Sequence, residues 1–139
     1  APACMGQYDH LHLTVVQKPE ILAQINAAFQ KAVGDPNMQV TYGAPTVIYV
    51  SCKNEDEEIV KGCNAGVVME NMLLEAADLG LGAVYLFGVS QVLFANEEIT
   101  KLLQIPEGFR TVSAIAVGTS ADALQERTLG TDKISTTTL

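Results

Sequence analysis

The side chains in this sequence with the widest chemical repertoire are three cysteines and two histidines. They are Cys4, Cys52 and Cys63, with His10 and His12. The cysteines form no Cys-x-x-Cys pair, and neither histidine completes a zinc-ligand spacing with them. An odd number of cysteines also does not build a disulfide framework. We therefore expect Cys52 and Cys63 to be buried free thiols.

A run of acidic side chains over residues 54–58 offers oxygen atoms, which are the ligands that calcium prefers. The run lacks the alternating Asp and Asn residues and the central glycine of an EF-hand loop, so we expect a solvated loop. The sequence also contains no glycine-rich phosphate loop and no nucleophile elbow. The residues by themselves therefore present no side-chain constellation for catalysis.

The charge balance narrows the class of partners. The 139 residues include 16 acidic and 8 basic side chains, which gives a formal net charge of −8. A surface of this sign repels phosphate and does not favour nucleic acid as a partner. With 48% hydrophobic residues, the chain can fold as one domain over residues 1–139. No apolar run reaches the ~18–20 residues that cross a bilayer, and no signal peptide is visible, so we expect a cytoplasmic protein.

Seven elements are predicted to position these side chains. In chain order they are a strand over 12–17, a helix over 19–33, a strand over 46–52, a helix over 64–79, a strand over 83–89, a short helix from 96 and a strand over 111–117. Pro19 suits a first helical turn, and Gly34 suits the end of the same helix. This order predicts a layered α/β or α+β domain in which helices cover four strands. The polar tail over 119–139 either frays or lies across a partner.

The helix predicted over 64–79 has an unusual surface. Asn64 is a good N-cap, and the polar residues of the helix share one arc, namely Glu70, Asn71, Glu75 and Asp78. The rest of the surface is almost entirely Val, Met, Leu and Ala, so we expect burial on most sides, in a central position or at a subunit interface. We interpret Met69 and Met72 as packing residues.

An ordered series of short motifs carries a resemblance to a known family. Gly-Ala-Pro at 43–45 precedes a strand, Asn-Ala-Gly at 64–66 opens a helix that contains ENMLLEAA at 70–77, and LGLG follows at 79–82. IPEGFR at 105–110 and Ala-Val-Gly at 116–118 complete the series. The series closely resembles the flavin-dependent nitroreductase family, and the opening residues 1–5 match it more loosely.

The resemblance implies an α+β, three-layer fold with a central four-stranded, mainly antiparallel sheet flanked by helices. It also implies an intertwined homodimer in which the C-terminal tail is exchanged with the partner, and FMN in the dimer interface. The implied activity passes electrons from NAD(P)H through the flavin to a nitroaromatic, quinone or related acceptor. The protein would position the flavin and shape the acceptor pocket.

The resemblance also assigns cofactor-binding residues. One group matches the stretch that lies against the flavin of the neighbouring subunit: Pro2, Ala3 and Cys4. Another matches the segment whose backbone amides reach the flavin ring: Leu86, Phe87 and Gly88. The alternative for the first group is an ordinary loop, and the alternative for Phe87 is a core residue. Gly88 would allow close approach of the ring.

Basic residues form the third group that the resemblance assigns. Arg127 and Lys133 stand near the positions that contact the FMN phosphate, with exposed tail charges as the alternative. Arg110 is expected to be structural and to form a pair near the start of its strand. Asn71 is expected to hydrogen-bond within the helix packing.

The largest departure from the family lies at the N-terminus. Family members open with a helix and an Arg-Ser-x-Arg-like motif that holds the phosphate, and neither is present in the 139 residues. Each lost charge-assisted hydrogen bond costs about 1.5–3 kcal/mol. The alternative to an enzyme is therefore a cofactor-poor or cofactor-free dimer that acts as a binding or regulatory module. Another alternative is a related flavin reaction, such as dehalogenation, enone reduction or cleavage of the flavin itself.

Overall fold

The computed structural model describes residues 2, 6–88, 92, 96–122, 126, 128, 130 and 133–139. The elements in chain order are η1 (Gln7–His10), β1 (Leu11–Val16), α1 (Pro19–Val33), β2 (Thr46–Lys53), α2 (Glu58–Asp78), β3 (Gly82–Tyr85), α4 (Glu97–Leu102) and β4 (Phe109–Gly118). The predicted order of strands and helices is confirmed, and η1 is an addition to it. Among the described residues, no helix is long and apolar enough to span a bilayer.

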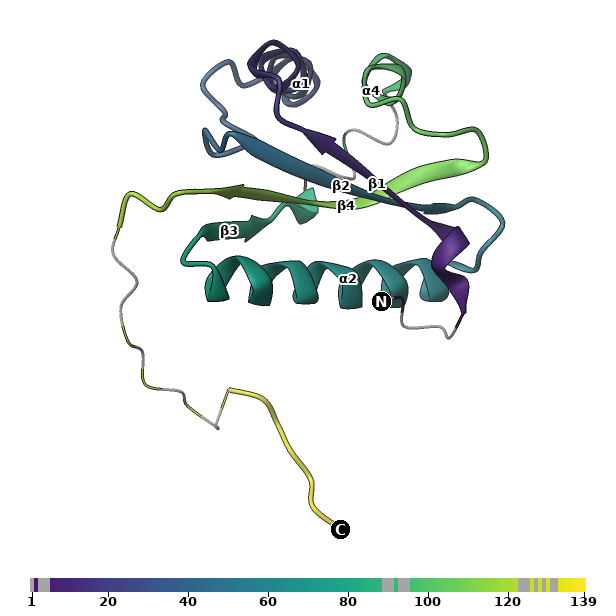
Figure 1. The fold of residues 1–139 in the computed structure, drawn as a ribbon, viewed down its shortest axis with the longest axis vertical. Coiled ribbons are helices and arrows are strands. Elements are labelled where there is room, and N and C mark those ends of the chain that lie inside the picture. The colour runs from purple at the N-terminus through teal and green to yellow at the C-terminus, as the bar shows by residue number, and fades with distance from the viewer. Residues whose placement is uncertain are drawn as a thin grey trace.

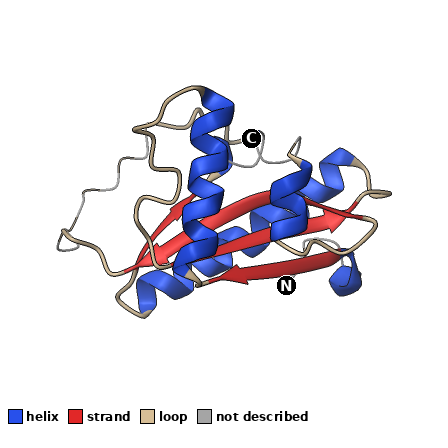
Figure 2. Ribbon diagram, turned by 90° about the horizontal axis from the view of Figure 1, so that it is seen from above, coloured by secondary structure: helices blue, strands red, loops and turns tan. Residues whose placement is uncertain are grey.

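The strands form one antiparallel sheet in the order β1-β2-β4-β3. Helices α1 and α4 cover one face of the sheet and α2 covers the other (Figure 1). Helix α1 is seen end-on in Figure 1 and lengthwise in Figure 2, where it crosses the strands. The predicted three-layer α+β fold with a four-stranded antiparallel sheet is therefore confirmed.

Two apolar clusters hold the layers together, one on each face of the sheet. Ile25 and Phe29 of α1 pack with Tyr49 of β2 on the α1–α4 face. Met69 of α2 packs with Ile115 of β4 on the opposite face, which confirms the packing role predicted for Met69. Because β2 and β4 contribute to both clusters, the two central strands are the most buried part of the sheet.

The ends of α1 and the start of α4 agree with the prediction. Pro19 occupies the first turn of α1, and Gly34 ends the helix with a φ of 73°, a conformation that glycine adopts without strain. The Asn96 side chain accepts hydrogen bonds from the backbone N–H groups of Glu98 and Ile99 at the start of α4. Both helix boundaries therefore follow from local chemistry.

The start of α2 and the end of β3 differ from the prediction. Helix α2 begins at Glu58, six residues before Asn64, which lies buried in its interior rather than at its N-cap. Part of the acidic run is therefore helical, because acidic side chains are favourable at the positive end of a helix. Strand β3 ends at Tyr85, since Phe87 and Gly88 already have helical geometry.

Helix α2 is covered on only one side by the described residues of this chain, so it does not occupy a central position within one subunit. The other predicted means of burial, a subunit interface, stays a prediction. The predicted polar arc is exposed, and apolar Ile59, Val67 and Leu74 are exposed as well, Leu74 to 60%. Cys63 is also exposed in this chain, against the prediction, whereas Cys52 is buried as expected.

Candidate functional site

The most informative hollow lies where β3 ends. Leu86, Phe87 and Gly88 line one side of a groove of about 170 Å³. The loop over residues 38–42 lines the other side, with contributions from Phe29 and Tyr85. The structure thus brings one predicted cofactor-binding group together with a loop that sequence reasoning missed. No chemical motif marks residues 38–42, and the nearest signal is the Gly-Ala-Pro motif that follows them.

Two polar side chains of α1 position this loop. Asn26 accepts a hydrogen bond from the Val40 backbone N–H through Oδ1, at 2.9 Å, and its Nδ2 donates to Gln39 Oε1 at 3.3 Å. Gln30 Nε2 donates to the Met38 carbonyl oxygen at 2.9 Å. Val40 is buried, so the loop is held by both packing and hydrogen bonds.

Tyr42 is the most exposed side chain of the loop. Its φ of 54° lies in the left-handed region, and the next residue, Gly43, has a φ of 72°. Two consecutive left-handed residues reverse the chain before β2 and turn the Tyr42 side chain outward, where it is 72% exposed. Non-glycine residues in this region are uncommon and concentrate where the surrounding structure imposes them.

The described residues that line the groove carry no charge, and three of them are exposed aromatic residues: Tyr42, Tyr85 and Phe87. Phe87 is 63% exposed, so its alternative role as a core residue is wrong. Among the described residues beyond its chain neighbours and its own helix backbone, no atom lies within 4 Å of a Cβ built at Gly88, so the described surroundings leave this space open. These features suit a flat, uncharged ring and not a phosphate group.

The backbone amides of the segment are not equivalent. The Leu86 N–H already donates to the Ala114 carbonyl oxygen at 2.8 Å and is engaged in the sheet. Phe87 and Gly88 open a helical turn, and the first N–H groups of a helix have no partner inside it. The Phe87 and Gly88 amides are therefore the donors that a ligand in the groove could use.

The groove is small for a complete cofactor site. Ligand pockets commonly have volumes of about 300–1,000 Å³, whereas this one has about 170 Å³. A second hollow of about 480 Å³ shares Tyr42 and is lined by residues 43–45, the start of β3 and residues 118–122. The groove holds at most part of a large ligand within this subunit.

Close packing beside this second hollow explains why two positions of the motifs are glycine. A Cβ atom at Gly118 would lie 2.8 Å from Cδ of Pro45, and one at Gly82 would lie 3.2 Å from Cβ of Ser120. Both distances are too short for an ordinary contact. The Gly-Ala-Pro, LGLG and Ala-Val-Gly motifs therefore meet in space, although they are far apart in the sequence.

Pro2 and Lys133, the other predicted site residues that the structure describes, do not line the groove. Pro2 is half-buried, while Ala3, Cys4 and Arg127 lie outside the described residues. Lys133 is exposed in the tail, which runs away from the layered body (Figure 1). The tail brings no basic side chain to the groove within the described part of one subunit.

Arg110 and Asn71 have structural contacts. The Arg110 guanidinium pairs with Glu58 of α2, as expected for a structural residue near the start of β4. Asn71 Nδ2 donates to the Val67 carbonyl oxygen of the same helix at 2.9 Å and is exposed. Its hydrogen bond is therefore local to α2.

Cys52 is not suited to act as a nucleophile. Burial, with a smaller contribution from the nearby Asp56 carboxylate, raises the pKa of its thiol to about 11. The thiolate, which is the reactive form, is therefore scarce at neutral pH.

Comparisons with known proteins complete the description. A sequence model described as the Nitroreductase family matches residues 7–119. A curated relative from Methanothermobacter thermautotrophicus has the provisional name NADH dehydrogenase/NAD(P)H nitroreductase. It is 33% identical over 115 residues, which are 80% of this chain and 56% of the relative. The chain thus spans a little over half of the length of that relative.

Solved structures share the fold. A nitroreductase with bound FMN from Bacteroides fragilis superposes with a TM-score of 0.75 at 22% identity, covering 99% of this chain and 80% of its own. A nitroreductase with bound FMN from Desulfitobacterium hafniense gives a TM-score of 0.73 at 19% identity, covering 94% and 77%. At these identities the likeness establishes the architecture of the sheet and its helices.

Proposed function

Because the chain belongs to the nitroreductase family, we propose that it is an FMN-dependent oxidoreductase that passes electrons from NAD(P)H through flavin to a nitroaromatic, quinone or related acceptor. The observation that carries the proposal is the uncharged groove between residues 38–42 and the segment Leu86, Phe87 and Gly88. A flavin ring is flat, aromatic and uncharged in its oxidised form, so it suits the exposed aromatic side chains of this groove.

The residues present fit the ring part of FMN. The open space above Gly88 admits a ring face, and the Phe87 and Gly88 amides are donors for the ring's carbonyl and nitrogen atoms. Tyr42 lines the groove, and we propose that its side chain covers one side of the ring. Bound FMN would supply the two-electron chemistry, and this chain's residues would bind it, orient it and shape the acceptor space above it.

The phosphate part of FMN needs residues beyond the groove. We assign this contact to Arg127 and Lys133 of the tail, and a second contact with the ring to Pro2, Ala3 and Cys4 of the neighbouring subunit. The small volume of the groove within one subunit supports a site that a partner completes. Lys133 makes no ion pair among the described residues, so its charge is available to a ligand.

A homodimer in which the tails over 119–139 are exchanged is the assembly that we propose. Ile59, Val67 and Leu74 leave an apolar strip on the outer side of α2 without a cover in this chain. Strand β1 is an edge strand with exposed Leu13 and Val15, and such edges are normally covered. We further propose that residues 1–139 act as one domain and that the protein is cytoplasmic.

A second candidate function is a cofactor-poor or cofactor-free dimer that acts as a binding or regulatory module. The absence of basic side chains among the described residues that line the groove favours it, since an FMN phosphate is bound best by charge-assisted hydrogen bonds. The two candidates differ in one property, which is the affinity for FMN.

Titration of FMN into the purified protein separates the candidates. The proposed enzyme becomes yellow, binds FMN with micromolar or tighter affinity and oxidises NAD(P)H when a nitroaromatic or quinone acceptor is present. Riboflavin, which lacks the phosphate, separates the ring contacts from the phosphate contacts. Protein that stays colourless and inactive after FMN is added refutes the enzyme and supports the second candidate.

A further inference from the structure

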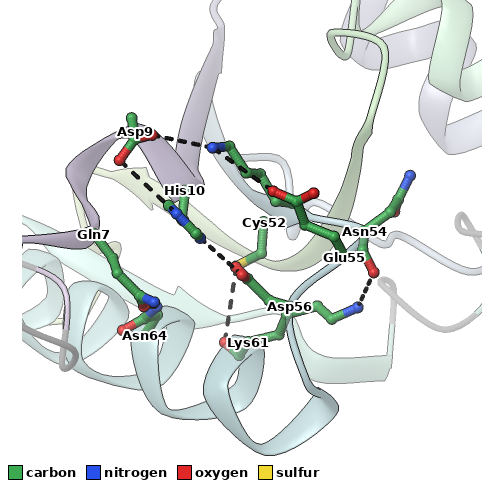
Figure 3. Close-up of polar contacts among 10 residues, drawn as sticks. Gln7, Asp9, His10, Cys52, Asn54, Glu55, Asp56, Lys61 and Asn64 are labelled. Atoms are coloured by element: carbon green, nitrogen blue, oxygen red, sulfur yellow. Dashed lines mark hydrogen bonds and ion pairs between the residues drawn. The ribbon is translucent and has the colours of Figure 1, made fainter.

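Three long-range polar contacts fasten the short helix η1 to the corner between β2 and α2 (Figure 3). The atoms are Asn64 Nδ2 with Gln7 Oε1 at 3.0 Å, Lys53 Nζ with Asp9 Oδ2 at 3.0 Å, and His10 Nδ1 with Asp56 Oδ1 at 2.7 Å. We call these six residues the η1 clamp. Three of the four residues of η1 take part in it.

Apolar packing does not explain where η1 lies. None of its residues is buried, and Tyr8, its one large aromatic residue, is 68% exposed. A segment without a buried side chain gains little from the hydrophobic effect. The position of η1 therefore depends on the polar contacts of the η1 clamp and on its covalent link to β1.

Two of the three partners on the β2–α2 side, Asn64 and Asp56, have buried side chains, whereas Lys53 is 25% exposed and pairs with the exposed Asp9. Asn64 is fully buried within α2, where asparagine is a poor helix former and a buried amide is costly unless it is paired. The Asp56 side chain is 7% exposed, and its second oxygen has no hydrogen-bond partner among the described residues. If stability were the only requirement, an apolar residue would be favoured at both positions.

The η1 clamp lies next in the chain to the N-terminal residues that we assign to the flavin. Gly6, with a φ of 81°, turns the chain immediately before Gln7. Five residue steps separate Pro2 from Gln7, so Pro2 lies at most about 18 Å from η1. The position of η1 therefore limits how far from it the N-terminal residues can extend.

We propose that Asn64, Lys53 and Asp56 are positioning residues, which hold η1 and thereby present the N-terminal residues to the flavin of the neighbouring subunit. This inference rests on the proposed function. The positioning residues contact neither flavin nor acceptor in the proposal. They act through Gln7, Asp9 and His10.

The first test uses Asn64→Leu, which has a similar volume and favours the helix. We expect α2 to remain folded and amide hydrogen exchange of residues 6–10 to accelerate by about fivefold, the ratio that corresponds to one net hydrogen bond. We expect the dissociation constant for added FMN to rise by about the same factor. Lys101→Ala, which removes an exposed pair with Glu97 on α4, is the matched control and leaves both measurements unchanged.

The second test exchanges the charges of the Asp9–Lys53 pair. Lys53→Asp alone places two carboxylates together, so it should weaken FMN binding and accelerate exchange in η1. The double variant Asp9→Lys with Lys53→Asp restores an opposite-charge pair and should recover most of both effects. A merely structural role would lower the Tm of Lys53→Asp, whereas a positioning role changes the flavin absorbance spectrum, which reports the environment of the ring, at an unchanged Tm.

The outcomes separate the inference from the proposed function. If the wild-type chain does not bind FMN, the proposed function is refuted and the positioning role with it, while hydrogen exchange still reports whether the η1 clamp exists. If the wild type binds FMN and the variants bind it equally well despite faster exchange in η1, only the positioning role is refuted. If exchange in η1 does not change, the η1 clamp itself is refuted.

Discussion

Removal of the Asn26 side chain is expected to release the loop over residues 38–42 from α1. In Asn26→Ala the buried Val40 N–H loses its acceptor at 2.9 Å, and Gln39 loses a donor at 3.3 Å. A buried donor without a partner costs about 1–3 kcal/mol, and an exposed hydrogen bond contributes less. We expect a loss of about 1–2 kcal/mol in the free energy of unfolding, which lowers the Tm by about 3–7 °C.

Two matched variants identify the cause of that loss. Asn26→Asp keeps the acceptor for the Val40 N–H and loses only the donor to Gln39, so we expect it to lose less than half as much stability. Gln24→Ala changes an exposed residue on the same helix and should leave the Tm unchanged. Thermal unfolding by circular dichroism measures all three.

The same variants test whether the loop belongs to the cofactor site. Because residues 38–42 form one side of the groove, Asn26→Ala should weaken FMN binding more than Asn26→Asp does. Equal Tm values for Asn26→Ala and the wild type would refute the hydrogen bonds. Unchanged FMN affinity in a destabilised Asn26→Ala would refute the assignment of the loop to the site.

Three further predictions concern the groove, the core and the tail. Gly88→Val fills the open space above the backbone and should abolish flavin binding with little change in Tm, because no described residue beyond its chain neighbours and its own helix backbone lies within 4 Å of the added Cβ. Retained FMN binding would contradict the placement of the ring. Burial raises the pKa of the Cys52 thiol from 9.0 to about 11. In a Cys4→Ser, Cys63→Ser background, alkylation of Cys52 at pH 8 should therefore proceed only after unfolding. Rapid labelling of the folded protein would contradict the burial of Cys52. Deletion of residues 126–139 should shift the dimer toward monomer in light scattering, whereas an unchanged mass would count against tail exchange.

Local chemistry was sufficient to predict much of the fold. The amphipathic pattern and caps of α1 and α4, and the β-branched runs of β2 and β4, depend on neighbours within a few residues. Their boundaries therefore agree with the structure to within one or two residues. The antiparallel sheet was predicted only through the family resemblance, and the strand order was not predicted, because pairing between β2 and β4 joins residues that are far apart in the sequence.

The errors have long-range physical causes. Asn64 has the type of an N-cap, yet its amide is paired with Gln7, 57 residues away, and is therefore tolerated inside α2. Cys63 was expected to be buried because cysteine is usually buried, but the outer side of α2 has no cover in one subunit.

The candidate site was predictable in part. Leu86, Phe87 and Gly88 were found through the motif resemblance, and they do line a groove. Residues 38–42 were not found, because the hydrogen bonds from Asn26 and Gln30 that place them form only after α1 and the loop are folded. The exposure of Phe87 could not be predicted from the sequence either, because it depends on where β3 ends.

The most direct test of the central claim is an equilibrium titration of the wild-type protein and Gly88→Val with FMN and riboflavin, followed by absorbance and fluorescence. Our account predicts one flavin per chain in the wild type, measurable binding of riboflavin because the groove recognises the ring, and tighter binding of FMN. It also predicts no binding of either flavin by Gly88→Val. A wild-type protein that binds neither flavin, or a Gly88→Val variant that binds both as well as the wild type, would contradict the account.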